Sequence, residues 1–220
     1  YNGRVRRMDA ATRTITTVAG NGSYPTSGDG GPALNAGFEW PEGLGLDAAG
    51  NLFITDMDAG RVRRVDHATG IITTVAGSGL GYGGDGGPAT SALLNYPSDV
   101  AIAANSDIYI ADSENQRVRR VRNGTITTVA GNGFETGSID GPGGDSRDDL
   151  GDGGQAKQAS FSYPWSVRID PAGDLVIGDS GNSRIRRLEI ASGIISTIVG
   201  DGVYRFAGDG GPATAASLKG

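Results

Sequence analysis

The sequence contains one unit four times, and this repeat constrains the fold more than any other feature. The triplet Arg-x-Arg-Arg begins at the following positions: Arg4, Arg61, Arg117 and Arg184. The tetrapeptide Gly-Asp-Gly-Gly follows the same rhythm, beginning at Gly28, Gly84, Gly151 and Gly208. Both series have intervals of 56, 57 and 67 residues, so one unit contains an insertion. Such a period indicates units that bury their faces against their neighbours.

Each complete unit contains four short apolar runs separated by turns. The runs of the first complete unit are 43–47, 52–56, 61–65 and 72–77. They alternate in polarity or are rich in β-branched residues, which is typical of strands. Four short antiparallel strands in each unit predict the blade of a β-propeller, an all-β fold. In the stretch between units we expect a helical turn after Pro88.

The repeats divide the chain into a single propeller segment, 1–220. We expect a half blade with its connection at 1–40, followed by blades at 41–96, 97–163 and 164–220. The blade at 97–163 carries a glycine-rich acidic insertion at 134–151. Three and a half four-stranded blades cannot close a ring, because sheet faces and edges stay open. We therefore expect the parent chain or another chain to supply further blades.

Composition excludes some classes of function. The 39 glycines follow the turns of the repeat, and the net charge of −6 argues against a nucleic-acid partner, which favours basic faces. The chain has no cysteine, so it has no thiolate metal site and no thiol nucleophile. No apolar run approaches the length of a membrane span, and we expect no membrane insertion.

The residues of the first complete unit resemble a known repeat. The matching text is P-x-G-L-x-L-D-x-x-G-N-L-x-I-x-D from Pro41 to Asp56, followed by G-R-V-R-R-V-D and T-G-I-I-T-T-V-A-G. It resembles NHL repeats, especially those of bacterial extracellular proteins and of the teneurin propeller. The resemblance covers essentially the whole chain and implies rings of six blades. It is a weak guide to function, because members of the family include protein-binding, RNA-binding and lyase propellers.

The recurring charged residues favour a structural role. The aspartates of Gly-Asp-Gly-Gly can satisfy turn backbone, although a ring of carboxylates could also hold a cation. The aspartates that end the second strands can pair with the Arg-x-Arg-Arg arginines or cap the next loop. Those arginines can cover apolar surface between blades, although they could also form a basic binding stripe. The aspartates in question are Asp29, Asp85, Asp152 and Asp209 in the first set, and Asp56, Asp112 and Asp179 in the second.

Departures from the repeat are better candidates for a binding site. Arg168 stands where the other units have Gly45 and Ala101, and a buried arginine would need a local carboxylate or a ligand anion. Trp165 is a second departure. An aromatic residue also precedes each blade-starting proline, where it could stack on the proline or face a ligand at the channel mouth. We predict ligand or partner binding by Arg168, Trp165, Tyr163, Trp40 and Tyr96.

The insertion is a candidate calcium site, because calcium favours several oxygen ligands from one loop. A solvated acidic loop is the alternative, and the spacing does not fit an EF-hand. The candidate ligands are Asp140, Asp145, Asp148, Asp149 and Asp152.

No catalytic constellation is visible in the sequence. His67 is the single histidine, and it lies in a turn, so neither a histidine-lined channel nor a triad can form. We therefore predict a non-enzymatic binding or scaffold module that presents a loop face to a protein or glycan partner in the extracellular space or periplasm. The alternative is a segment of a propeller lyase or hydrolase whose catalytic residues lie in other blades.

Overall fold

The computed structural model describes residues 2–134 and 150–219, and these residues form fourteen strands in four antiparallel sheets. A half blade consists of β1 (Val5–Met8) and β2 (Ile15–Ala19). The first blade consists of β3 (Pro41–Leu46), β4 (Leu52–Asp56), β5 (Arg61–Val65) and β6 (Ile72–Ala76). Strands pair in sequence order within each sheet.

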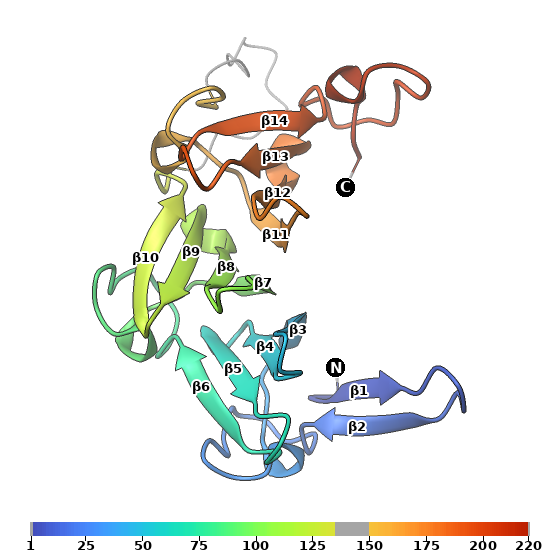
Figure 1. Cartoon of the computed structure of the whole chain (residues 1–220), viewed down its shortest axis with the longest axis vertical. Helices are drawn as coiled ribbons and strands as arrows, with labels where there is room; N and C mark the ends of the chain where they lie inside the picture. Colours follow the sequence, from blue (N-terminus) through green and yellow to red (C-terminus); the bar gives the residue numbers. More distant parts are fainter. Residues whose placement is uncertain (1, 135–149, 220) are drawn as a thin grey trace.

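Two further blades repeat this arrangement. The second blade consists of β7 (Pro97–Ile102), β8 (Ile108–Asp112), β9 (Arg117–Arg122) and β10 (Thr125–Ala130). The third blade consists of β11 (Pro164–Ile169), β12 (Leu175–Asp179), β13 (Arg184–Leu188) and β14 (Ile195–Val199). Figure 1 shows the sheets as an open arc, with β3, β7 and β11 toward its hollow side. The predicted partial propeller is thus confirmed.

Short 3-10 helices lie in the connectors, the segments that lead from the fourth strand of one sheet to the first strand of the next. Those at equivalent places are η1 (Ala33–Asn35), η2 (Ala89–Ser91), η4 (Ala156–Gln158) and η6 (Ala213–Ala215). The helical turn predicted after Pro88 is therefore present as η2. Two others, η3 (Ser113–Asn115) and η5 (Ser180–Asn182), follow β8 and β12. No helix in the described ranges is long and apolar enough to cross a membrane.

The apolar core lies between successive sheets. Val62 of β5 packs in one cluster with Ile110 of β8, and Val118 of β9 packs in another with Ile177 of β12. These four side chains are fully buried. Because each blade buries its face against the next, the sheets stabilise one another in the manner of a repeat protein.

The third strand of each blade departs from simple alternation. Val62 and Val65 would point to opposite faces of a regular strand, and this predicts a bulge or a strong twist. The pairing of β5 with β6 shifts register between Val62 and Arg63, and β13 with β14 shifts between Ile185 and Arg186. The irregularity lets the middle arginine of the triplet turn toward the preceding connector.

Candidate partner-binding surface

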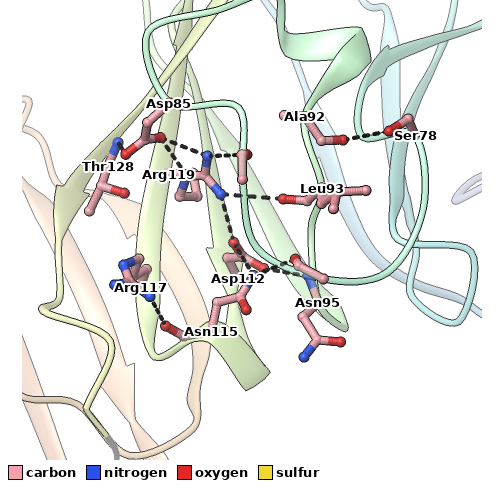
Figure 2. A network of polar contacts seen from close by, with 12 residues as sticks. Ser78, Asp85, Ala92, Leu93, Asn95, Asp112, Asn115, Arg117, Arg119 and Thr128 are labelled. Carbon is pink, nitrogen blue, oxygen red and sulfur yellow. Dashed lines mark hydrogen bonds and ion pairs between the residues drawn. The ribbon is translucent and has the colours of Figure 1, made fainter.

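Each connector before a complete blade is fixed by a buried arginine of that blade. In the second blade, Arg119 donates from Nε and Nη2 to Oδ1 of Asp85, at 3.0 and 2.6 Å (Figure 2). The Arg119 side chain is 0% exposed. We call this contact the connector ion pair. Its equivalents are Arg63 with Asp29 and Arg186 with Asp152, each at 2.7 Å.

The guanidinium of Arg119 joins three parts of the blade at once. It donates to the carbonyl oxygens of Gly83 and Leu93 in the connector, and Nη1 lies 3.1 Å from Oδ2 of Asp112 at the end of β8. Asp112 in turn accepts the backbone N–H of Asn95 at 2.7 Å (Figure 2). A planar guanidinium with five donors suits such a junction. The predicted pairing of strand-ending aspartates with the arginines is confirmed here.

The two other strand-ending aspartates show the same role with variation. Asp179 lies 3.5 Å from Nη1 of Arg186 and accepts the N–H of Ser162. Asp56 accepts two backbone N–H groups, those of Glu39 and Trp40, both at 2.9 Å. In all three blades the carboxylate holds the segment that enters the innermost strand.

Burial separates the aspartates into two electrostatic classes. Burial raises the pKa of Asp112 and of Asp179 to about 6, and it also raises the pKa of Asp56. For Asp85, partial burial acts in the raising direction, but hydrogen bonds from Thr128 and the charge of Arg119 hold its pKa below the usual value. The connector carboxylates are therefore ionised well below neutral pH.

Backbone hydrogen bonds fix the connector as well. Gly86 donates to the carbonyl of Ile126 at 2.8 Å, and Ile126 donates back to Gly87 at 3.1 Å. Gly84 has a φ of +85°, and a Cβ there would lie 2.7 Å from the Cα of Ala92, so only glycine fits. The connector before the second blade is consequently fixed at several points, and what it exposes is held in place.

Every connector exposes at least one aromatic side chain between its first glycine and the Gly-Asp-Gly-Gly turn. Phe134 and Phe206 are 74% and 77% exposed. Tyr82 is also exposed, and Arg117 covers its ring with the guanidinium carbon 3.9 Å from the ring centroid. The remaining members of this set, which we call the connector aromatics, are Tyr24 and Tyr204.

The aromatic residues predicted at the channel mouth lie at the entry to the innermost strands. Tyr96 and Tyr163 precede β7 and β11 with left-handed φ values of 52° and 48°. Trp40 precedes β3, and its indole N–H donates to Oε2 of Glu42 at 2.9 Å. Left-handed backbone at a residue before proline is uncommon and is held by surrounding contacts. Here Gln116 accepts the N–H of Tyr163 at 2.7 Å.

Arg168 meets the local carboxylate that was one of its two predicted partners. Its Nη1 forms an ion pair with Asp99 of β7 and donates to the carbonyl of Val167. Asp99 also accepts the N–H of Val167 at 3.0 Å, so this carboxylate joins the innermost strands of two blades. The Arg168 side chain is still 63% exposed, and Trp165 on the same strand is exposed too.

Comparison with known proteins agrees with this architecture. The NHL repeat family matches residues 94–121 and 161–188. This chain contains NHL repeats. The relatives include Teneurin-1 of Mus musculus, 27% identical over 84% of this chain, and the chloroplastic Protein SUPPRESSOR OF QUENCHING 1 of Arabidopsis thaliana, 27% identical over 87%. The NHL-repeat chain spans 7% and 17% of the lengths of these two relatives.

Solved structures share the NHL-repeat fold. A protein of unknown function from Bacteroides thetaiotaomicron is 18% identical, with a TM-score of 0.60 over 98% of this chain and 57% of its own. A structure of the nidogen/laminin complex contains a chain that is 14% identical, with a TM-score of 0.57 over 90% of this chain and 59% of its own. At these identities the likeness concerns the fold alone.

Of the predicted calcium ligands, one lies within the residues that the structure describes and four lie outside them. Asp152 is described, and it is engaged by Arg186 in a connector ion pair. Within the described ranges no group of three His, Cys, Asp or Glu residues could hold a metal ion. His67 is exposed in the turn after β5. The other candidate ligands lie outside the described residues: Asp140, Asp145, Asp148 and Asp149.

The connector aromatics are the surface residues that the repeat analysis missed. They stand outside the periodic strands, in loops of unequal length, so alignment of the units superposes Tyr24 with Tyr204 but not with Tyr82 or Phe134. A readable signal does exist, because each connector has Tyr or Phe between its first glycine and the Gly-Asp-Gly-Gly turn. Of the residues that the analysis singled out instead, Tyr163 lies at the other end of its connector and Trp165 lies in β11.

Proposed function

We propose that this NHL-repeat chain is a non-enzymatic binding module that presents its connectors to a protein partner. The observation that carries the proposal is the exposure of Tyr24 and Tyr82 on the two connectors that the ion pairs of Arg63 and Arg119 fix. Large apolar side chains exposed on rigid loops are the composition of protein interfaces. Because the loops are already ordered, binding costs little conformational entropy.

The residues at the channel mouth form a second part of the proposed interface. Trp165 and Tyr96 are exposed there, and the exposed guanidinium of Arg168 offers donors beside them. Aromatic and arginine side chains are the types most often found at binding hot spots. Tyr163 and Trp40 complete this set. The proposal includes a location outside the cytoplasm, which the similarity to Teneurin-1 supports.

A matched pair of variants tests the proposal. The connector variant replaces Tyr82, Phe134 and Phe206 by serine, and the control variant replaces Met8 and Ile15, which are exposed on the half blade. Each biotinylated protein is cross-linked to the secreted proteins of its source and the products are identified by mass spectrometry. A partner enriched by the wild type should be lost with the connector variant and retained with the control.

Two results would contradict the proposal. Equal enrichment by both variants would remove the connectors from the interface. Saturable binding to a glycan array, with no cross-linked protein, would replace the protein partner by a glycan. A third variant, Trp165→Ala with Arg168→Ala, tests the channel-mouth part separately, and unchanged enrichment would remove those residues from the interface.

A further inference from the structure

The turn between β9 and β10 of the second blade contains an asparagine with a left-handed backbone conformation. Asn123 and Gly124 are its two central residues, with φ values of 50° and 76°. Two left-handed residues in succession define the tight hairpin turn that favours Asn-Gly. Asn123 is exposed, and within residues 2–134 and 150–219 its side chain makes no hydrogen bond. The amide group is therefore free to rotate toward the following backbone.

Two of the chain's three other Asn-Gly pairs differ from this one because hydrogen bonds hold the asparagine side chain. The amide of Asn21 donates to the carbonyl of Asn35 at 2.9 Å, and its oxygen accepts the N–H of Ser23 at 2.7 Å. The amide of Asn132 donates to Oγ of Ser160 at 2.9 Å, and its oxygen accepts the N–H of Phe134. Both side chains are held at each end, so they cannot turn without losing these bonds.

Space around Gly124 is open as well. A Cβ placed on this glycine would meet no atom within 4 Å, whereas one on Gly133 would lie 2.1 Å from the guanidinium of Arg117. No side chain or backbone atom therefore crowds the Gly124 α-carbon on the side where a Cβ would lie. Glycine is the residue that best permits its own nitrogen to approach the amide carbon of a preceding asparagine, because it has no Cβ.

We propose that Asn123 is a site of spontaneous deamidation in the folded protein. The backbone nitrogen of Gly124, after losing its proton, attacks Cγ of Asn123. A nitrogen–carbon bond forms, the bond from Cγ to the amide nitrogen breaks, and ammonia leaves with the proton it gains from solvent. Water then opens the resulting five-membered imide at either carbonyl, giving aspartate or isoaspartate. Water is the only co-reactant, and nothing is oxidised or reduced.

The modification would act on a joint between a blade and its connector. The carbonyl of Gly124 accepts the N–H of Ala89 at 2.7 Å, which ties the β9–β10 turn to η2. Isoaspartate lengthens the backbone by one methylene at this turn and adds a negative charge. The tight geometry of the turn cannot accommodate the extra atom, so the hydrogen bond to Ala89 should be lost and the local backbone should exchange its amide hydrogens faster.

Peptide mapping of the intact folded chain tests the site with internal controls. The protein is incubated at pH 8 and 37 °C, digested, and analysed by mass spectrometry with isoaspartate-specific methyl labelling. Asn123 should convert about tenfold faster than Asn21 and Asn132, because two hydrogen bonds must break first at each control. Asn2, also followed by glycine and exposed near the end of the chain, serves as a reference for an unhindered pair.

Variants separate the mechanism from general instability. Asn123→Gln should abolish isoaspartate at this turn, because glutamine closes a larger ring less readily, and should leave Asn21 unchanged. A synthetic peptide of residues 118–128 reports the rate without tertiary structure. Conversion of Asn123 at or below the rates of Asn21 and Asn132 in the folded chain, or a folded rate far below that of the peptide, would overturn the proposal.

Discussion

The half blade and the second blade contain the same Arg-x-Arg-Arg motif in different structural surroundings. Arg119 of the second blade is fully buried between Asp85 and Asp112, whereas the equivalent Arg6 is exposed and meets no carboxylate among the described residues. Ile126 of β10 is 0% exposed, and the equivalent Ile15 of β2 is 50% exposed. The same residues are thus core in one unit and surface in another.

The connector before the second blade and the connector after the third blade show the same contrast in burial. Ala89, next to the connector ion pair of the second blade, is 1% exposed, while the equivalent Ala213 is exposed. Asp209 has no arginine partner within the described residues. A unit therefore does not create its own core, because its third and fourth strands are covered by the preceding connector. Paired substitutions at equivalent positions can test this dependence directly.

The largest expected difference concerns the arginines. Arg119→Ala leaves Asp112 as an uncompensated buried charge, and we expect the free energy of unfolding to fall by about 3–5 kcal/mol. Arg6→Ala should change it by less than about 0.5 kcal/mol, as for other surface positions. Urea denaturation of both variants measures the difference. Equal losses would show that the connector ion pair adds nothing to the repeat.

The isoleucines should give the next largest contrast. Ile126→Ala opens a cavity in a fully buried position, at an expected cost of about 2–5 kcal/mol. Ile15→Ala removes a half-exposed side chain and should cost less than about 1 kcal/mol. The same denaturation experiment applies. A large loss for Ile15→Ala would mean that the half blade is covered in solution.

A smaller effect should appear in the pH dependence of stability. Burial raises the pKa of Asp112 to about 6 in the folded chain, above its ordinary value of 3.8. The folded state therefore binds this proton more tightly, and the group's contribution to the free energy of unfolding decreases as pH rises from about 4 to 6. In Asp112→Asn, the decrease in the free energy of unfolding between pH 4 and pH 6 should be smaller by about 1–3 kcal/mol.

The smallest contrast concerns the tyrosines. Arg117 covers the ring of Tyr82, so Tyr82→Leu should lower stability by about 0.5–1 kcal/mol through loss of the cation–π contact. Tyr24 has no arginine over its ring among the described residues, and Tyr24→Leu should leave the melting temperature unchanged. Thermal unfolding at low and high salt compares the two. Equal shifts would show that the stacked guanidinium contributes nothing.

Much of the fold could be predicted because the repeat superposes equivalent residues. Alternation around Val62 predicted an irregular third strand, and the register shift confirms it. The structural role predicted for Asp29, Asp85 and Asp152 follows from their recurrence, and each lies in a connector ion pair. Recurrence works here because the physical demand, a partner for a buried arginine, recurs with the architecture.

The surface was harder to predict than the scaffold. Arg168 was recognisable as a departure from the repeat sequence, but its partner Asp99 lies 69 residues away in the neighbouring blade. Asp99 is itself a departure, since the equivalent residues are Gly43 and Ser166, and two opposite charges departing in adjacent units were the available signal. Contacts of this kind have no period. They depend on how neighbouring blades meet, which a single unit does not encode.

The two residues of each connector ion pair are separated by the same number of residues, and this has a consequence for where the chain can accept insertions. Each aspartate lies 34 residues before its arginine, including Asp152 in the unit that carries the insertion. Sequence added before Gly151 leaves this distance unaltered. Length is thereby held constant between each connector aspartate and the arginine of the following blade. A foreign epitope or an affinity tag grafted between Phe134 and Leu150 should leave folding undisturbed, while one grafted after Asp152 should prevent it.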